Sequence, residues 1–136
     1  MKRSSRLLLT AWISLLLPAS AENKLGGRYV GDWNSESLGV GGAFRLTISQ
    51  AADPKWNCEV TFTLGGEDEV RTAVKFVRVE RSKLEVRYEF DLQGNRLQST
   101  ITGELLEKRL EGKYQTVRVA DGAPVDQGRW KAALSE

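Results

Sequence analysis

Residue types that catalyse reactions are sparse in this sequence. The chain has no histidine, which removes the commonest general base, the Ser-His and Cys-His nucleophilic systems and histidine metal sites. A carboxylate-based enzyme would need two acids that face one pocket. Acids such as Glu85, Glu89 and Glu104 instead fall on the phase of the strands that we assign outward. We therefore assign no catalytic residue, and an enzyme is the least favoured function.

Three consecutive acids, Glu67, Asp68 and Glu69, are the one cluster with metal-binding chemistry. With backbone carbonyls they could hold calcium, which prefers oxygen ligands. Their spacing does not match an EF-hand loop, and a solvated hairpin tip is the favoured interpretation. No glycine-rich loop joins a strand to a helix, as a phosphate-cradling motif requires. The sequence predicts no metal site and no cofactor.

The chemistry that the sequence does carry is that of a binding pocket. Along the predicted strands, aromatic residues recur on the inward-facing phase with small or polar residues between them. This set comprises Trp33, Phe44, Trp56, Phe62, Tyr88, Phe90, Tyr114 and Trp130, with Gly31, Ser99, Gly103, Gly112, Thr116 and Gly128. Inside a small barrel, small residues either accommodate large neighbours or leave room for a ligand. The sequence leaves both outcomes open.

A cavity would make the protein a non-catalytic binder of an apolar or amphipathic small molecule, which is our first hypothesis. The polar side chains that would orient the ligand and the tryptophans that would line the cavity are Tyr88, Ser99, Tyr114, Trp33 and Trp130. The loop from Ser35 to Gly42, with three glycines, would be the lid. The second hypothesis is a protein-interaction module with a filled core that acts through its outer surface or a sheet edge.

These residues must be positioned by antiparallel strands joined by short turns. Between Val70 and Val117 apolar and polar residues alternate with the period of two that marks a half-buried strand. A turn at Gln93-Gly94 places Phe90 opposite Leu97, Val86 opposite Ile101 and Leu84 opposite Gly103. A turn at Glu107-Lys108 places Leu105 opposite Leu110, Gly103 opposite Gly112 and Ile101 opposite Tyr114. A slip of one residue in either register would turn apolar side chains to solvent.

The whole chain predicts eight strands in sequence order and no helix. Four of them lie in the segment just described, the first being Val70 to Glu80, and the others are Arg28 to Asn34, Ala43 to Gln50, Trp56 to Leu64 and Gln127 to Leu134. Near-uniform spacing predicts an all-β, antiparallel up-and-down meander. The first and last strands of eight run antiparallel, so their pairing would close the barrel. An open sheet or a two-sheet sandwich is the alternative.

The fourth strand changes its apolar phase along its length. Val70, Val74 and Phe76 continue the register of the third strand, with Leu64 facing Val70 and Cys58 facing Phe76, and Val77 and Val79 then carry the other phase. One extra residue near Phe76-Val77 would reconcile the two halves, so we predict a β-bulge or sharp bend there. A strand buried on both faces is the alternative.

The first 21 residues are typical of a secretory signal peptide. A basic start precedes an apolar stretch from Leu7 to Leu17 and the small residues Ala19-Ser20-Ala21. Cleavage after Ala21 would leave one domain from Glu22 to Glu136, in the periplasm or outside the cell. Loss of the three leader cations leaves 17 Lys and Arg against 18 Asp and Glu, a net charge of −1. This balance gives no case for nucleic-acid binding, and we expect no stable membrane insertion.

Cys58 is the only cysteine, so the chain can form no intramolecular disulfide. It lies in phase with Trp56 and Val60, which predicts a buried and inert thiol. An intermolecular disulfide is the alternative, and a homodimer is a partner state that the sequence leaves open.

The Gly31-Asp32-Trp33 motif, opening an exported eight-strand meander, resembles the lipocalin-like (calycin) proteins. The run "GDWNSESLG" followed by "LTI" also resembles the start of avidin-type barrels. The resemblance implies that Trp33 closes the base of the barrel and that an arginine of the last strand packs on it, for which Arg129 is the nearest residue. Gly-x-Trp recurs at Gly128 to Trp130, so we expect the first and last strands to lie side by side with their tryptophans plugging one end. No biotin-binding residue set accompanies the motif, so biotin binding is not implied.

Overall fold

The computed structural model describes residues 25–51 and 55–135, and it confirms an all-β chain. The predicted signal peptide lies outside the described residues. The strands are β1 (Gly27–Ser35), β2 (Gly41–Gln50), β3 (Trp56–Thr63), β4 (Glu69–Arg71), β5 (Ala73–Glu80), β6 (Lys83–Leu92), β7 (Asn95–Leu106), β8 (Arg109–Arg118) and β9 (Pro124–Ser135). Within the described ranges there is no helix with the length and apolar character needed to cross a bilayer.

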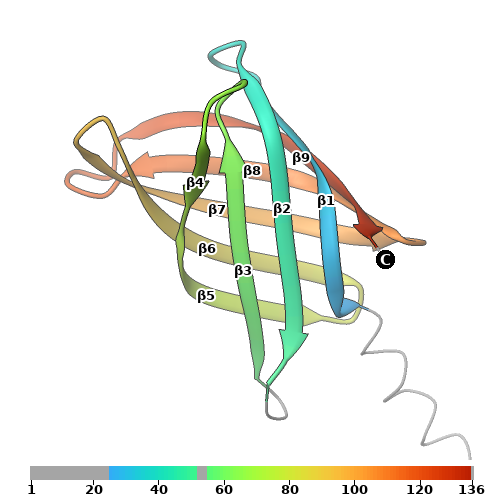
Figure 1. The fold of residues 1–136 in the computed structure, drawn as a ribbon. Helices are drawn as coiled ribbons and strands as arrows, with labels where there is room; N and C mark the ends of the chain where they lie inside the picture. Colours follow the sequence, from blue (N-terminus) through green and yellow to red (C-terminus); the bar gives the residue numbers. More distant parts are fainter. Residues whose placement is uncertain (1–24, 52–54, 136) are drawn as a thin grey trace, which may run out of the picture.

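The strands form one antiparallel meander that curls into a nearly closed barrel (Figure 1). Hydrogen-bonded neighbours follow the chain from β4 back to β1 and from β5 forward to β9, and pairing of β1 with β9 joins the two halves. Trp33 lies directly opposite Trp130 in that pairing. The predicted meander and the predicted contact between first and last strands are confirmed. Each of these two strands pairs with a neighbour on both sides, β1 with β2 and β9, and β9 with β8 and β1, so neither presents an exposed edge.

The strands number nine rather than eight because the fourth predicted strand is broken at Thr72. At this break the Thr72 hydroxyl donates a hydrogen bond of 2.8 Å to the carbonyl oxygen of Val60 in β3. The first part, β4, pairs with β3, and the second part, β5, pairs with β6. Figure 1 shows the consequence: β2 and β3 run across β5 and β6, and the ladder remains open between β3 and β5.

The two hairpin registers predicted for the central strands are confirmed. Phe90 pairs with Leu97 and Val86 with Ile101 across β6 and β7, and Ile101 pairs with Tyr114 across β7 and β8. Gln93 and Gly94 both have positive φ, at 51° and 83°. Two such residues form the tight turn whose twist matches antiparallel strands, so the turn fixes the register locally.

The predicted irregularity in the fourth strand is present one to two residues earlier than expected. The register of β5 against β6 shifts between Val74 and Phe76, which leaves Lys75 as the extra residue of a bulge. The predicted facing pairs Leu64–Val70 and Cys58–Phe76 are wrong. The turn begins already at Leu64, whose carbonyl accepts the Glu67 amide at 3.1 Å. Val70 therefore pairs with Phe62, and β5 forms no ladder with β3.

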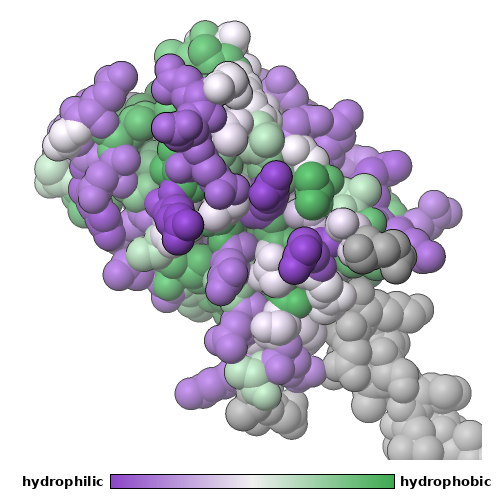
Figure 2. Space-filling view, viewed as in Figure 1, coloured by the Kyte–Doolittle hydropathy of each residue, from purple (hydrophilic) through white to green (hydrophobic). Residues whose placement is uncertain are grey.

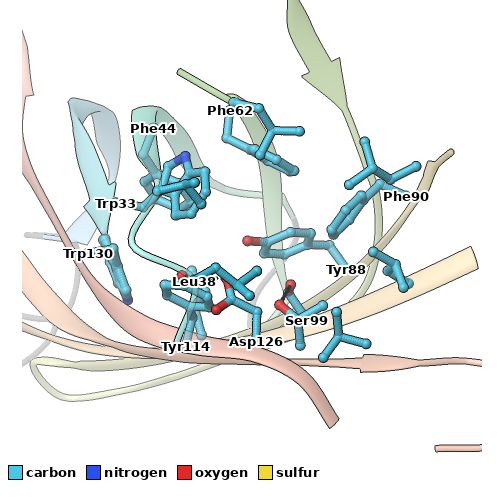
Figure 3. A pocket seen from close by; sticks show the side chains of 17 residues that line it. Trp33, Leu38, Phe44, Phe62, Tyr88, Phe90, Ser99, Tyr114, Asp126 and Trp130 are labelled. Atoms are coloured by element: carbon cyan, nitrogen blue, oxygen red, sulfur yellow. Dashed lines mark hydrogen bonds between the residues drawn. The ribbon is translucent and has the colours of Figure 1, made fainter. Parts of the chain in front are cut away.

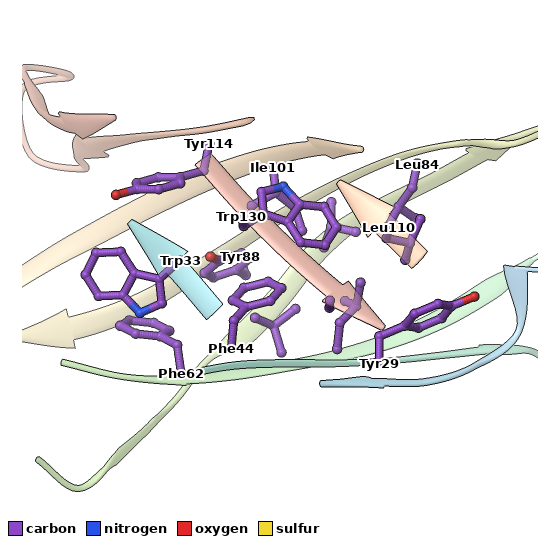
Figure 4. Packing of buried hydrophobic residues seen from close by; sticks show 14 of the residues in the cluster. Tyr29, Trp33, Phe44, Phe62, Leu84, Tyr88, Ile101, Leu110, Tyr114 and Trp130 are labelled. Carbon is purple, nitrogen blue, oxygen red and sulfur yellow. The ribbon is translucent and has the colours of Figure 1, made fainter. Parts of the chain in front are cut away.

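The core fills one end of the barrel and thins toward the other. Buried side chains at the filled end come from all parts of the wall: Leu25, Tyr29, Leu46, Ile48, Val60, Leu84, Val86 and Leu110. The Tyr29 hydroxyl donates to the carbonyl oxygen of Leu25 at 3.0 Å, which fixes the start of the described chain over this end. Figure 4 shows Tyr29, Leu84 and Leu110 at one end of the cluster and Trp33, Phe62 and Tyr114 at the other.

The sequence suggested that the two tryptophans plug one end of the barrel. In the structure Leu25 and Tyr29 fill the closed end, and Trp33 and Trp130 lie further along the interior (Figure 4). The ring of Trp130 occupies the space above Gly103, where an added Cβ would stand 2.5 Å from its Cζ2 atom. A glycine at position 103 leaves room for the Trp130 indole, which crosses directly over it. Small residues in narrow barrels often accommodate a large neighbour in this way.

The outer surface is mainly polar. Figure 2 shows hydrophilic side chains over the face formed by β2, β3 and β4, with hydrophobic ones at the top, over the β1–β2 loop. Two acids assigned outward form exposed ion pairs, Glu85 with Arg78 at 2.7 Å and Glu89 with Arg96 at 3.1 Å. Such pairs contribute little to stability, so the interior must supply it.

Candidate ligand-binding pocket

The thin end of the core contains an apolar cavity of about 100 Å³. Its lining comes from seven of the nine strands and from the β1–β2 and β3–β4 loops. All five residues predicted to form the binding site are in it: Trp33, Tyr88, Ser99, Tyr114 and Trp130 (Figure 3). Leu38 and Val40 of the β1–β2 loop also line it and are 60% and 46% exposed. The cavity therefore reaches the surface at this loop. The structure brings the five residues together, and their role in binding stays a prediction.

Aromatic side chains form the rigid walls of the pocket. Trp33 packs edge-to-face against Phe62 and Tyr114, with ring centroids 6.1 and 5.9 Å apart, and Trp130 packs on Phe44 at 5.1 Å. Each indole N–H is also committed to a backbone carbonyl, that of Trp33 to Thr63 at 2.8 Å. The indole of Trp130 donates to Thr102 at 3.1 Å. Rings held by both packing and hydrogen bonds keep the pocket formed without a ligand, as binding sites usually are.

Three hydroxyl groups are placed deep in this apolar lining. The hydroxyls of Ser99 and Thr116 lie 2.5 Å apart and satisfy each other. The Tyr88 side chain is only 4% exposed, and burial raises the pKa of its phenol above the ordinary value. The nearby Ser99 hydroxyl opposes part of that rise. A tyrosine hydroxyl both donates and accepts, so beside Ser99 the Tyr88 hydroxyl keeps capacity for a further hydrogen bond.

The β1–β2 loop is held over the pocket by a carboxylate. Asp126 accepts hydrogen bonds from the Ser35 hydroxyl at 2.6 Å and from the Tyr114 hydroxyl at 2.9 Å. The Ser35 oxygen in turn accepts the backbone N–H of Leu38 at 2.8 Å. Burial, followed by the hydrogen bond to Asp126, raises the pKa of Tyr114. The loop thus has a defined attachment, as a lid requires, and Tyr114 serves that attachment rather than pointing a free hydroxyl at a ligand.

Sequence reasoning missed Asp126, although a signal for it was present. Asp126 shares the phase of Gly128 and Trp130, but the last strand was expected to begin at Gln127. It begins at Pro124, so the inward-facing phase extends back to Asp126. The arginine implied by the family resemblance does not pack on Trp33, because Arg129 has the opposite phase and forms an exposed ion pair with Glu36 at 3.3 Å.

Paired carboxylates and metal-binding clusters are the other two kinds of site to consider among the described residues. Among the described residues that line the cavity, Asp126 is the single carboxylate, so no pair of acids faces the pocket. Over residues 25–51 and 55–135, no three side chains of the metal-binding types are grouped so as to hold an ion. Glu67 and Asp68 lie in the exposed β3–β4 turn, and Glu69 begins β4, where its carboxylate accepts the Thr61 hydroxyl at 2.9 Å.

Comparison with known proteins adds no family. The sequence matches no protein-family model and no curated protein. The antiparallel, nearly closed barrel is consistent with a calycin-like architecture.

Proposed function

We propose that this protein is an exported, non-catalytic binder of a small apolar or amphipathic molecule, with the barrel interior as its site. The observation that supports this is the preformed cavity, lined by aromatic rings and covered by a loop that has its own attachment. A dry cavity of about 150 Å³ in another protein holds benzene. A space of about 100 Å³ that opens to solvent suits one small ring or a short chain whose polar end reaches the loop.

The retention of the cavity favours a functional origin. A larger apolar residue at Ser99, inside the lining, would fill part of the space. The sequence keeps two hydroxyls there, at Ser99 and Thr116. Retention of space and polarity in an otherwise apolar interior is typical of a ligand site.

The open ladder between β3 and β5 supports a second candidate function, recognition of a partner through a sheet edge. The two strands face a surface hollow of about 840 Å³, and Phe76 within it is 37% exposed. The same edge carries features that protect against strand addition. Lys75 forms a bulge, and the Arg87 guanidinium covers the Phe76 ring at 5.1 Å. We therefore place this function second.

The experiment that tests binding begins with a native mass spectrum of the protein purified after export. A non-covalent adduct at the monomer mass supports the pocket, and its mass gives the ligand. A bare dimer mass would instead support an interaction module.

Titration of the ligand-free protein with cyclohexylmethanol, followed through the indole N–H signals of Trp33 and Trp130 by NMR, then locates the site. These signals should shift, and that of Trp56, which lies outside the pocket lining, should not.

A matched pair of variants gives the control. In S99L/T116V the leucine fills the cavity, so cyclohexylmethanol binding should fall at least tenfold. In S99A/T116V the same two hydroxyls are lost but the cavity stays open, so cyclohexylmethanol binding should persist. Unshifted indole signals in the wild type, or equal binding by both variants, would count against the pocket.

A further inference from the structure

We propose that the pocket selects a cationic ligand, a small organic ammonium whose apolar body lies among the aromatic rings and whose charged end meets Asp126. The inference rests on the proposed binding function and names the chemical class of its ligand. It comes from charges: the described lining holds one ionised group, the carboxylate of Asp126, and neither lysine nor arginine. An amine with a basicity like that of lysine is protonated at neutral pH.

Asp126 has unused capacity for a cation. A carboxylate offers about four acceptor positions, and the two hydrogen bonds from Ser35 and Tyr114 occupy two of them. Both donors are neutral hydroxyls, so the negative charge is not cancelled. No lysine or arginine of the described chain forms an ion pair with Asp126, although seven such pairs occur elsewhere on it. Asp126 is also half-buried, where an ion pair is stronger than in water.

The groups around Asp126 suit an ammonium rather than an anion. Tyr114, hydrogen-bonded to Asp126, and Trp33, packed against Tyr114, offer ring surfaces to which a cation is attracted. Tyr88 and Tyr114 line the same pocket. Figure 3 shows Tyr88 pointing its hydroxyl into the pocket on the side where Asp126 and Tyr114 stand. An ammonium has three donors, and the Tyr88 oxygen can accept one of them.

One side of the rim carries the same sign of charge. The loops at this end contain four acids, of which Glu36 pairs with Arg129 at 3.3 Å and Asp121 with Arg118 at 3.0 Å. Glu67 and Asp68, in the β3–β4 turn, form no ion pair within the described chain, so the uncompensated charge of these loops is negative. The β3–β4 turn belongs to this rim, because the Gly65 amide donates to the Gly41 carbonyl at 2.7 Å. Clefts rimmed by one sign of charge attract the opposite ion and repel the like one. A fatty acid or another carboxylate would meet this field unfavourably.

The test uses three probes that share one apolar body: cyclohexylmethylamine, cyclohexylmethanol and cyclohexanecarboxylate. Affinities are measured for the full exported protein at pH 7, with the indole N–H signals of Trp33 and Trp130 reporting the site. We expect the amine to bind at least tenfold more tightly than the alcohol, and the carboxylate to bind most weakly. Added salt should weaken binding of the amine and leave that of the alcohol unchanged, which tests the charge without any substitution.

Three variants separate the charge of Asp126 from its attachment of the loop. Asp126→Asn should remove the preference for the amine, so that the ratio of amine affinity to alcohol affinity falls to about one. Ser35→Ala breaks the attachment but keeps the charge, so the preference should persist. Asp32→Asn, on the outer face of β1, is the matched control and should change neither affinity.

Equal affinity for amine and alcohol in the wild type would overturn the cationic ligand and leave the proposed function standing. If Asp126→Asn weakens the binding of all three probes by the same factor, the cationic ligand is likewise overturned and the proposed function stands. Failure of all three probes to shift either indole signal would overturn both.

Discussion

The paired hydroxyls of Ser99 and Thr116 give the sharpest test of how the interior is built. They stand directly opposite each other on β7 and β8, are 3% and 5% exposed, and form one short hydrogen bond. We consider Ser99→Ala, Thr116→Val and the double variant. Valine has nearly the shape of threonine, so the second change removes the hydroxyl with little change in packing.

The expected energies follow from which hydroxyl loses its partner. Each single variant leaves the other hydroxyl buried without this partner, so Thr116→Val and Ser99→Ala should each lower the free energy of unfolding by about 1–3 kcal/mol. In the Ser99→Ala background, Thr116→Val removes the orphaned group, so it should stabilise the protein by about 0.5–1 kcal/mol. The coupling energy is then at least about 1.5 kcal/mol, as expected for residues in contact.

Urea denaturation of the four proteins, with comparison of their m-values, measures these differences. The decisive result is the change of sign: Thr116→Val destabilises the wild type and stabilises the Ser99→Ala variant. If Thr116→Val has the same effect in both backgrounds, the two hydroxyls are not bonded to each other. The polar part of the pocket would then need to be rebuilt on other residues.

Three further outcomes are expected. Gly103→Ala places a methyl group against the Trp130 ring, so overpacking should cost about 1–3 kcal/mol in thermal unfolding and shift the Trp130 indole signal; an unshifted signal would contradict the close approach. Tyr29→Phe removes the bond to the Leu25 carbonyl and should cost about 1 kcal/mol in urea, whereas unchanged stability would show that this bond does not hold the filled end. Cys58 is half-buried beside the β3–β5 hollow rather than fully buried as predicted, and desolvation, followed by the charge of Glu59, raises its pKa to about 12. Because only the thiolate reacts, alkylation at pH 8 should be roughly a thousandfold slower than in the urea-unfolded chain; equal rates would mean an open thiol.

Local patterns predicted the fold well wherever a tight turn fixed them. The Gln93-Gly94 and Glu107-Lys108 turns set the registers of β6, β7 and β8, because a two-residue turn leaves one alignment that keeps apolar residues on one face. The same alternation predicted the contact of β1 with β9 and placed all five proposed site residues on the inner face. Burial confirms that face for each of them.

Prediction was least accurate where several strands meet. The break at Thr72 depends on a hydrogen bond to Val60 of another strand, and no pattern within the residues around Thr72 encodes it. The early turn at Leu64 shifted the β3–β4 register by two residues, which preserves the face of every side chain and therefore leaves no mark in the alternation. Asp126 was missed because the last strand was expected to begin at Gln127, and its contact with Ser35, 91 residues away, leaves no local pattern.

The sequence by itself determined the strand pattern, the inner face and the chemical types available to a pocket, because side-chain alternation along a strand is a local property. Whether the small residues would be covered or leave space was decided only by the tertiary structure. Gly103 lies beneath the Trp130 ring, so its space is used, whereas Ser99 and Thr116 line a cavity that no side chain enters. The difference depends on how far each large ring reaches across a curved wall, and that distance is set by the closure of the barrel as a whole.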